Sequence, residues 1–130
     1  MKVLIAEDDC LWRDLLQSFL EPAADVQTVD DGRKAIEIIS ESFRQSDPFT
    51  IVFLDIQMPE RSGHEVLEAI RRLEQEQSLA EKVPCKVIMM TALSDSDNVT
   101  ESFLGRCDGF LVKPISHKAV NNILRQLGFL

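Results

Sequence analysis

The chain contains no tyrosine, one tryptophan and three cysteines among its 130 residues. Three cysteines cannot all pair, and Cys10, Cys85 and Cys107 match no zinc-ligand spacing, so we expect free thiols in a reducing cytoplasm. No apolar run approaches the ~20 residues of a membrane-spanning helix, and Met1 leads directly into a strand-like segment without a basic leader. These absences argue against a disulfide scaffold, a zinc site and membrane insertion, and they predict a cytoplasmic protein.

Basic residues are also few. Lysine and arginine number 14 against 22 aspartates and glutamates, which gives a formal net charge of −8. Nucleic-acid binding draws most of its affinity from basic surface, so this balance disfavours direct contact with nucleic acid. The segment from Phe110 onward has no acid and carries Lys113, Lys118 and Arg125, which we interpret as a solvated basic helix.

The pattern that is present indicates one α/β domain spanning residues 1–130. Its length suits a single domain, and 45% hydrophobic residues can fill a core. Apolar runs alternate with helically spaced apolar residues: strands are expected at 3–6, 26–29, 50–54, 86–90 and 109–112, and helices around 11–20, 35–43, 66–73, 95–104 and 120–127. This alternation predicts a parallel sheet between two helix layers, a three-layer αβα sandwich, but does not reveal the strand order.

Polar side chains directly follow four of the apolar runs. They are Glu7 and Asp8 after the first, Asp55 after the third, Thr91 after the fourth and Lys113 after the fifth. Parallel strands bring such residues to one edge of the sheet, where open α/β sheets bind ligands. Clustered carboxylates repel one another unless a cation compensates them, and hard oxygen ligands select Mg²⁺, Mn²⁺ or Ca²⁺. The sequence therefore predicts a cleft for a divalent cation and a phosphoryl group.

Each of these residues also has a simpler interpretation. The acids can cap helices, as Asp9 is placed to do, and Thr91 can cap a helix or lie in a turn. Lys113 can lay its stem along apolar surface with its charge in water. The coincidence of all of them at strand ends favours the binding site.

Four ordered segments together resemble the receiver domain of two-component response regulators. They are residues 3–9 with the acidic pair, residues 53–59 around Asp55 with Gly63 after them, residues 89–92, and residues 109–114. The resemblance covers the whole chain. It implies a five-stranded sheet in the flavodoxin-like order 2-1-3-4-5 with five helices.

This resemblance implies a phosphoacceptor and a metal site. Asp55 would take a phosphoryl group from a sensor histidine kinase or a histidine phosphotransfer protein, giving an acyl phosphate. Asp8, Asp55 and the backbone carbonyl of Gln57 would bind Mg²⁺, for which Mn²⁺ can substitute. Glu7 would act through a bound water molecule.

The resemblance also implies the groups that hold and sense the phosphoryl group. Thr91 and Lys113 would hold its oxygens, and the bond between Lys113 and Pro114 would be cis. Thr91 and Phe110 would form the switch, which alters the surface of the fourth helix, last strand and last helix toward a downstream protein effector. Phe110 lacks a tyrosine hydroxyl and equally fits an ordinary packing role.

Several functions fit this fold. We expect a phosphorylation-controlled signalling switch that catalyses its own phosphorylation and dephosphorylation but does not turn over external substrates. Since the chain ends near Leu130, just after its last helix, it is expected to act by binding another protein. The alternative is a receiver-fold binding module that works without phosphorylation. A phosphohydrolase or phosphotransferase is disfavoured, because Gln57 stands where many such enzymes carry a second acid. A flavin carrier is disfavoured by the absence of tyrosine and by the acidic first loop.

Overall fold

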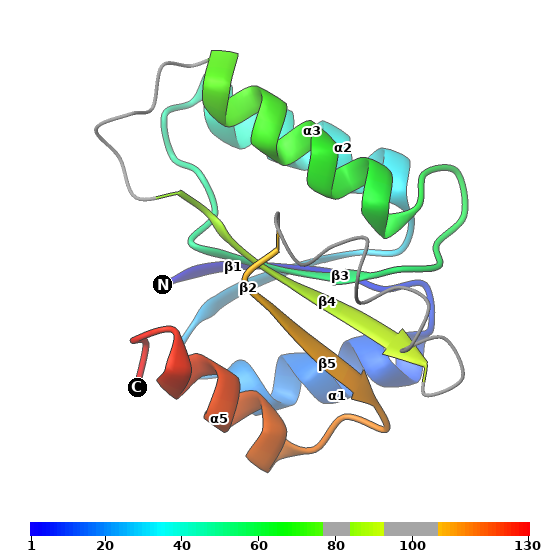
Figure 1. Ribbon diagram of the computed structural model, residues 1–130, viewed down its shortest axis with the longest axis vertical. Coiled ribbons are helices and arrows are strands. Elements are labelled where there is room, and N and C mark those ends of the chain that lie inside the picture. The colour runs from blue at the N-terminus through cyan, green and yellow to red at the C-terminus, as the bar shows by residue number, and fades with distance from the viewer. Residues whose placement is uncertain (77–83, 93–106) are drawn as a thin grey trace.

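The computed structural model describes residues 1–76, 84–92 and 107–130, which form one open sheet with helices on both faces (Figure 1). The strands are β1 (Lys2–Ala6), β2 (Asp25–Val29), β3 (Ile51–Asp55), β4 (Lys86–Ala92) and β5 (Gly109–Lys113). The helices are α1 (Cys10–Leu20), α2 (Gly32–Arg44), α3 (Gly63–Glu76) and α5 (His117–Gln126).

All strand pairs in the sheet are parallel, and the strand order is β2-β1-β3-β4-β5. This confirms the predicted parallel sheet and the order that the resemblance implied. The central strands β1, β3 and β4 consist of almost continuous apolar residues, because helices cover both of their faces.

The two faces of the sheet support separate hydrophobic clusters. Leu4 and Ala6 of β1 pack in the cluster beneath α2 and α3, whereas Val3 and Ile5 pack in the cluster against α1 and α5. Figure 1 shows these two helix pairs on opposite sides of the sheet. Successive side chains of a strand point to opposite faces of the sheet, so every second residue lies on the same face. The face on which the last side chain of a strand lies is therefore set by its position in this alternation.

Local signals explain where helices begin. The side chain of Asp9 accepts a hydrogen bond from the Leu11 backbone N–H at 2.9 Å, Asp31 does the same for Lys34 at 2.7 Å, and Ser116 for Ala119 at 3.0 Å. Each satisfies a backbone donor that has no partner within its helix. The N-cap expected at Asp9 is therefore confirmed.

Two details differ from the sequence interpretation. Strand β4 continues to Ala92, so Thr91 lies inside the strand rather than after it. The helical spacing of α1 is confirmed, but Leu11 is 77% exposed and Leu15 39%, because the apolar stripe is wider than the face that meets the sheet.

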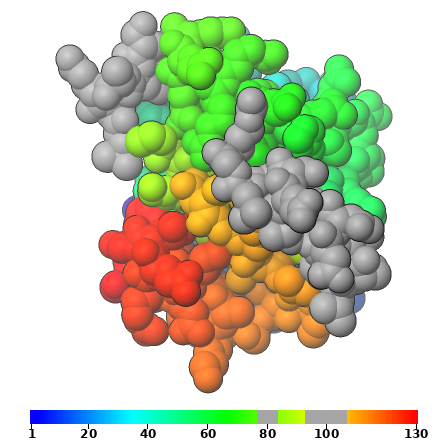
Figure 2. Space-filling model, in the orientation of Figure 1, coloured from blue at the N-terminus to red at the C-terminus, as the bar shows by residue number. Residues whose placement is uncertain are grey.

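The fourth helix in chain order, expected at 95–104, lies outside the described residues, which contain the other four helices. Strand β5 lies at one end of the strand order. Helix α5, which follows it, forms part of the surface seen in Figure 2. Among the described helices, none is both long and apolar enough to cross a membrane.

Candidate functional site

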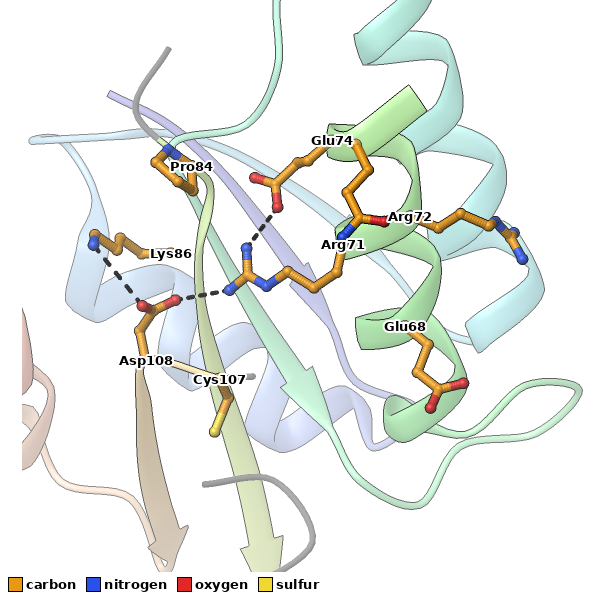
Figure 3. A pocket seen from close by; sticks show the side chains of 9 residues that line it. Glu68, Arg71, Arg72, Glu74, Pro84, Lys86, Cys107 and Asp108 are labelled. Atoms are coloured by element: carbon orange, nitrogen blue, oxygen red, sulfur yellow. Dashed lines mark hydrogen bonds and ion pairs between the residues drawn. The ribbon is translucent and has the colours of Figure 1, made fainter. Parts of the chain in front are cut away.

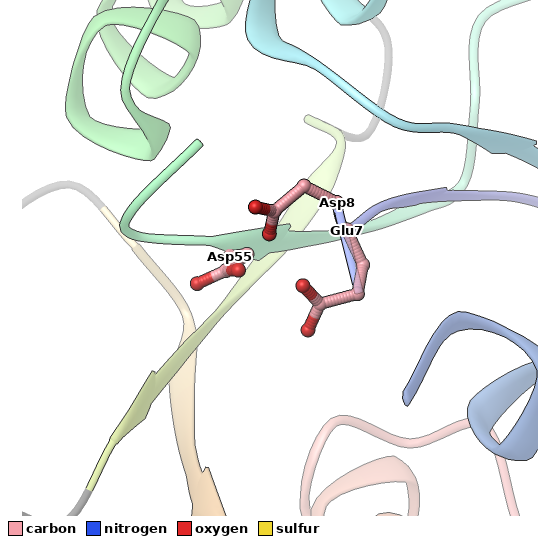
Figure 4. Close-up of side chains that lie close together, drawn as sticks. All are labelled: Glu7, Asp8 and Asp55. Atoms are coloured by element: carbon pink, nitrogen blue, oxygen red, sulfur yellow. The ribbon is translucent and has the colours of Figure 1, made fainter. Parts of the chain in front are cut away.

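Three carboxylates gather at the carboxyl ends of β1 and β3 (Figure 4). Glu7, Asp8 and Asp55 each offer an oxygen within 4.8 Å of the others. Glu7 is fully buried and Asp55 is 7% exposed, whereas Asp8 is exposed. The predicted convergence of the acids from two separate strands is therefore present.

Strand parity explains this convergence. On β1, Val3 and Ile5 face α1 and α5, and Glu7 is the next residue of the same parity. On β3, Phe53 faces the same way and Asp55 follows two residues later. Since β1 and β3 are adjacent and parallel, both side chains leave the sheet on one face at one edge.

Lys113 brings a cation to these acids from β5. Its ammonium nitrogen lies 2.5 Å from Oε1 of Glu7 and 3.5 Å from Oδ2 of Asp55. Burial lowers the pKa of Lys113, but the two carboxylates outweigh burial and raise the pKa above its ordinary value. Lys113 therefore stays charged and partly neutralises the cluster.

One lysine does not compensate all three acids. Burial raises the pKa of Asp55 to about 8, and the neighbouring Glu7 carboxylate adds to this rise against the opposing effect of Lys113. Apart from the Lys113 ammonium, no described residue offers a partner to Oε1 of Glu7, which accepts no hydrogen bond of good geometry. A buried oxygen of this kind, within reach of two further carboxylates, fits a divalent cation.

Asp8 and Asp55 line a cleft of about 240 Å³ at this edge of the sheet. Its walls come from the ends of four strands: Asp8, Asp9, Asp55, Ile56, Gln57, Thr91, Ala92 and Lys113. Thr91 is buried, and its hydroxyl donates a hydrogen bond to the Ala92 carbonyl at 3.2 Å. The cleft therefore holds carboxylates, a hydroxyl and an ammonium, as the strand-end pattern predicted.

Backbone contacts hold Asp55 in place. Its Oδ1 accepts a hydrogen bond from the Gln57 N–H at 3.2 Å, and the Ile56 N–H donates to the Met90 carbonyl at 3.0 Å. Gly63, which begins α3, packs so closely that an added Cβ would lie 2.5 Å from the Asp55 carbonyl oxygen. Only glycine fits there.

Other predicted residues lie around the cleft. The Lys113–Pro114 peptide bond is cis, as the resemblance implied. Phe110 is partly buried and packs against the cluster beneath α2 and α3. It does not line the cleft.

One neighbour was missed by the sequence interpretation. The ring of Trp12, which the sequence placed only within the helix expected at 11–20, has its centroid 5.9 Å from the Lys113 ammonium. A signal was available, because Trp12 comes four residues after Asp8, in the first turn of a helix that begins beside the cleft.

A larger cavity of about 580 Å³ lies at the opposite edge of the sheet (Figure 3). Its central charges neutralise one another, since Arg71 pairs with Glu74 at 2.8 Å and with Asp108 at 3.0 Å. The Asp108 carboxylate also accepts a hydrogen bond from the Val87 N–H at 2.8 Å. These contacts tie α3 to β4 and to the residue before β5, so we assign this cluster a structural role.

Comparisons with known proteins agree with the geometry. Residues 3–125 match the family model of the response regulator receiver domain. The osmosensing histidine protein kinase SLN1 of Saccharomyces cerevisiae is 27% identical over 97% of this chain and 10% of its own length. The chain spans between 7% and 55% of the length of this and other curated relatives.

Solved structures share the fold. The chemotaxis response regulator CheY4 of Vibrio cholerae has a TM-score of 0.74 and 26% identity, covering 97% of both chains. The receiver domain of the sensor histidine kinase PA1611 from Pseudomonas aeruginosa PAO1 has a TM-score of 0.76 and 20% identity, covering 96% of this chain and 94% of its own. The PA1611 structure has a magnesium ion coordinated in its active site cleft. Matched over nearly its whole length, this chain belongs to the response regulator receiver domain family of two-component signalling systems.

Proposed function

We propose that this receiver domain is a switch in which Asp55 accepts a phosphoryl group from a histidine. The observation that carries this proposal is the position of the Asp55 carboxylate, which lies within 4.8 Å of two further carboxylates and 3.5 Å from the Lys113 ammonium. Phosphoryl transfer depends on positioning and charge neutralisation more than on covalent chemistry from the protein, and this cleft supplies both.

The step is a displacement at phosphorus. A carboxylate oxygen of Asp55 forms a P–O bond while the P–N bond to the donor histidine breaks. The electron pair of that bond goes to the imidazole nitrogen, and the ring leaves neutral when its second nitrogen carries a proton. The product is an aspartyl phosphate, and the donor regains its free histidine.

The acids would hold the metal. Asp8, Asp55 and the Gln57 carbonyl would ligate Mg²⁺ directly and Glu7 through water, and Mn²⁺ can substitute. Bound there, Mg²⁺ would supply positive charge to the phosphoryl oxygens. Glu7 and Asp55 are buried, so their repulsion without a cation favours metal uptake.

Lys113 and Thr91 would hold the transferred group. The Lys113 ammonium lies beside the Asp55 carboxylate, and we propose that it pairs with a phosphoryl oxygen after transfer. The Thr91 hydroxyl, which donates to the Ala92 carbonyl here, would turn to donate to another phosphoryl oxygen. Phosphorylation would thereby pull on β4 from within the strand.

That pull would be passed to the output surface. Phe110 on β5 pairs in register with Met89, two residues before Thr91, and we propose that Thr91 and Phe110 shift together. The surface that changes would include the fourth helix, β5 and α5, and it would bind a downstream protein effector. Such couplings typically amount to about 1–3 kcal/mol.

The proposed donor is a sensor histidine kinase or a histidine phosphotransfer protein. Histidine kinases and response regulators among the relatives support this class of partner. We propose a cytoplasmic location, in keeping with the three free cysteines. We do not expect turnover of external substrates or direct nucleic-acid contact.

Incubation with Mg²⁺ and acetyl phosphate tests this function. Intact mass should show one adduct of roughly 80 Da on the wild type, the mass of a phosphoryl group, and none on Asp55→Asn. An equal adduct on both proteins, or none on the wild type at any quench time, would contradict the proposal. The absence of any adduct would favour the phosphorylation-independent binding module.

A further inference from the structure

Trp12 is the single tryptophan of the chain, and its ring faces the ammonium of Lys113. Among the described residues, three groups attract the Lys113 ammonium. They are Oε1 of Glu7 at 2.5 Å, Oδ2 of Asp55 at 3.5 Å and the Trp12 ring, whose centroid lies at 5.9 Å. A cation within about 6 Å of an indole face is attracted by the negative face of the ring.

These three attractions respond differently to a metal ion. Glu7 and Asp55 belong to the acidic cluster that can hold a divalent cation, so bound positive charge weakens their attraction for the ammonium. The indole is neutral and offers no oxygen ligand to a hard cation. Its attraction for Lys113 therefore persists when the acids are engaged.

The indole is also held firmly beside the cleft. Helix α1 begins two residues before Trp12, and Asp9 caps it through the Leu11 N–H at 2.9 Å. The next residue, Arg13, donates a hydrogen bond from its guanidinium to the Glu7 carbonyl at 3.0 Å. Trp12 itself is partly buried against the cluster between the sheet and α1 and α5. The ring thus has a fixed position relative to the end of β1.

We propose that Trp12 is a positioning residue that keeps the Lys113 ammonium over the cleft when a metal ion occupies the acids. Without the ring, the Lys113 ammonium would spend more time in solvent. Fewer encounters with a phosphoryl donor would then occur with the ammonium over the cleft, and phosphorylation would be slower. This role rests on the proposed phosphorylation of Asp55. It also makes the emission of Trp12 a reporter of the Lys113 position.

Rates of phosphorylation test the role. Wild type, Trp12→Phe, Trp12→Leu, Lys113→Met and the double variant Trp12→Leu/Lys113→Met are incubated with Mg²⁺ and acetyl phosphate, and the adduct is followed by intact mass. Trp12→Leu should slow the reaction roughly threefold to tenfold, whereas Trp12→Phe, which keeps an aromatic face, should stay within about twofold of the wild type.

The double variant separates positioning from general damage to the fold. If Trp12 acts through Lys113, Trp12→Leu should cause no further slowing once Lys113 is methionine. Equal slowing in both backgrounds, or a Trp12→Leu rate equal to that of the wild type, would overturn the proposal. Urea unfolding of each variant checks that it is folded.

Fluorescence gives a second measurement that needs no phosphorylation and no change at Trp12. Lys113→Met should alter the emission of Trp12 in metal-free buffer and reduce its response to Mg²⁺. The control Lys34→Met, on α2 across the sheet, should leave both unchanged. Identical emission and Mg²⁺ response in wild type and Lys113→Met would overturn the proposed contact. A wild type that takes no phosphoryl group would overturn the proposed function and this role with it, while the emission still decides whether the contact exists.

Discussion

The ammonium nitrogen of Lys113 lies 2.5 Å from Oε1 of Glu7, although β1 and β5 are separated in the sheet by β3 and β4. Both residues continue the parity of the face covered by α1 and α5, so their two long side chains point to the same face and meet there. The contact joins the two halves of the cleft. It also makes the stability of the metal-free protein depend on a buried charge pair.

We predict that Lys113→Met lowers the free energy of unfolding by about 3 kcal/mol in metal-free buffer, because the buried Glu7 carboxylate loses its cationic partner. Adding Glu7→Gln in the same background should recover about half of this loss, since the amide needs no counter-charge. Urea unfolding at pH 7 with EDTA measures both effects. A Lys113→Met variant as stable as the wild type would show that the pair contributes little.

The metal-free protein should lose stability as the pH rises from about 4 to about 8. Burial raises the pKa of Asp55 from its ordinary 3.8 to about 8, so in this window the folded state keeps a proton that the unfolded state has released. Unfolding then releases a proton, and the free energy of unfolding falls with rising pH. We expect a fall of roughly 2–3 kcal/mol, allowing for solvent screening in an open cleft.

Urea unfolding at several pH values in EDTA checks this dependence. Saturating Mg²⁺ should restore stability at pH 8, because a ligand of the folded state stabilises it by mass action. The matched control is Asp55→Asn, which cannot ionise at this position and should show a flatter profile. A wild-type profile that rises over this window, or that matches Asp55→Asn, would contradict the burial of an uncompensated carboxyl group.

Gly63→Ala should destabilise the protein by about 2 kcal/mol, because the new Cβ would lie 2.5 Å from the Asp55 carbonyl oxygen and 3.0 Å from the Ile56 Cα. Backbone atoms cannot move aside without displacing Asp55, so phosphorylation should slow as well. In the control Gly109→Ala, the new Cβ meets the flexible end of the Ile123 side chain, and the loss should be smaller. Equal losses in the two variants would argue against a tight fit at Gly63.

Asp108→Ala should destabilise the protein without affecting phosphorylation. The substitution removes the acceptor for the Val87 N–H and for the partly buried Arg71, and we expect a loss of about 2 kcal/mol. Asp47, whose carboxylate forms an exposed pair with Lys2, serves as the control, and Asp47→Ala should change stability by less than about 0.5 kcal/mol. A reduced phosphorylation rate in folded Asp108→Ala would contradict this prediction, because it would show that the Asp108 cluster influences the cleft at the other edge of the sheet.

The sequence predicted the site largely because strand ends are easy to recognise. Short apolar runs ending in Glu7, Asp55 and Lys113 indicate parallel strands that end at one edge, and the structure confirms their convergence. The strand order rested on the resemblance, because alternation of strands and helices fits several windings.

Other features depended on packing that the sequence does not display. The rotation of α1 about its axis decides that Trp12 faces Lys113 while Leu11 is exposed. Helical spacing alone places both residues on the apolar stripe and does not distinguish them. Thr91 was placed after β4 because its hydroxyl resembles a strand boundary, whereas its pairing with Val112 continues the ladder. The side chains of Lys113 and Glu7 meet although two strands lie between β1 and β5, and strand register alone does not predict this contact.

The most direct test of the account identifies the residue that carries the phosphoryl group. The wild type is phosphorylated with acetyl phosphate and Mg²⁺ and then treated with borohydride, which reduces an aspartyl phosphate to homoserine. Peptide mass spectrometry should find homoserine in place of Asp55 and leave Asp8, Asp9 and Glu7 unchanged. Homoserine at Asp8 or Asp9, or reduction of Glu7 with Asp55 intact, would contradict the assignment of Asp55 as the phosphoacceptor.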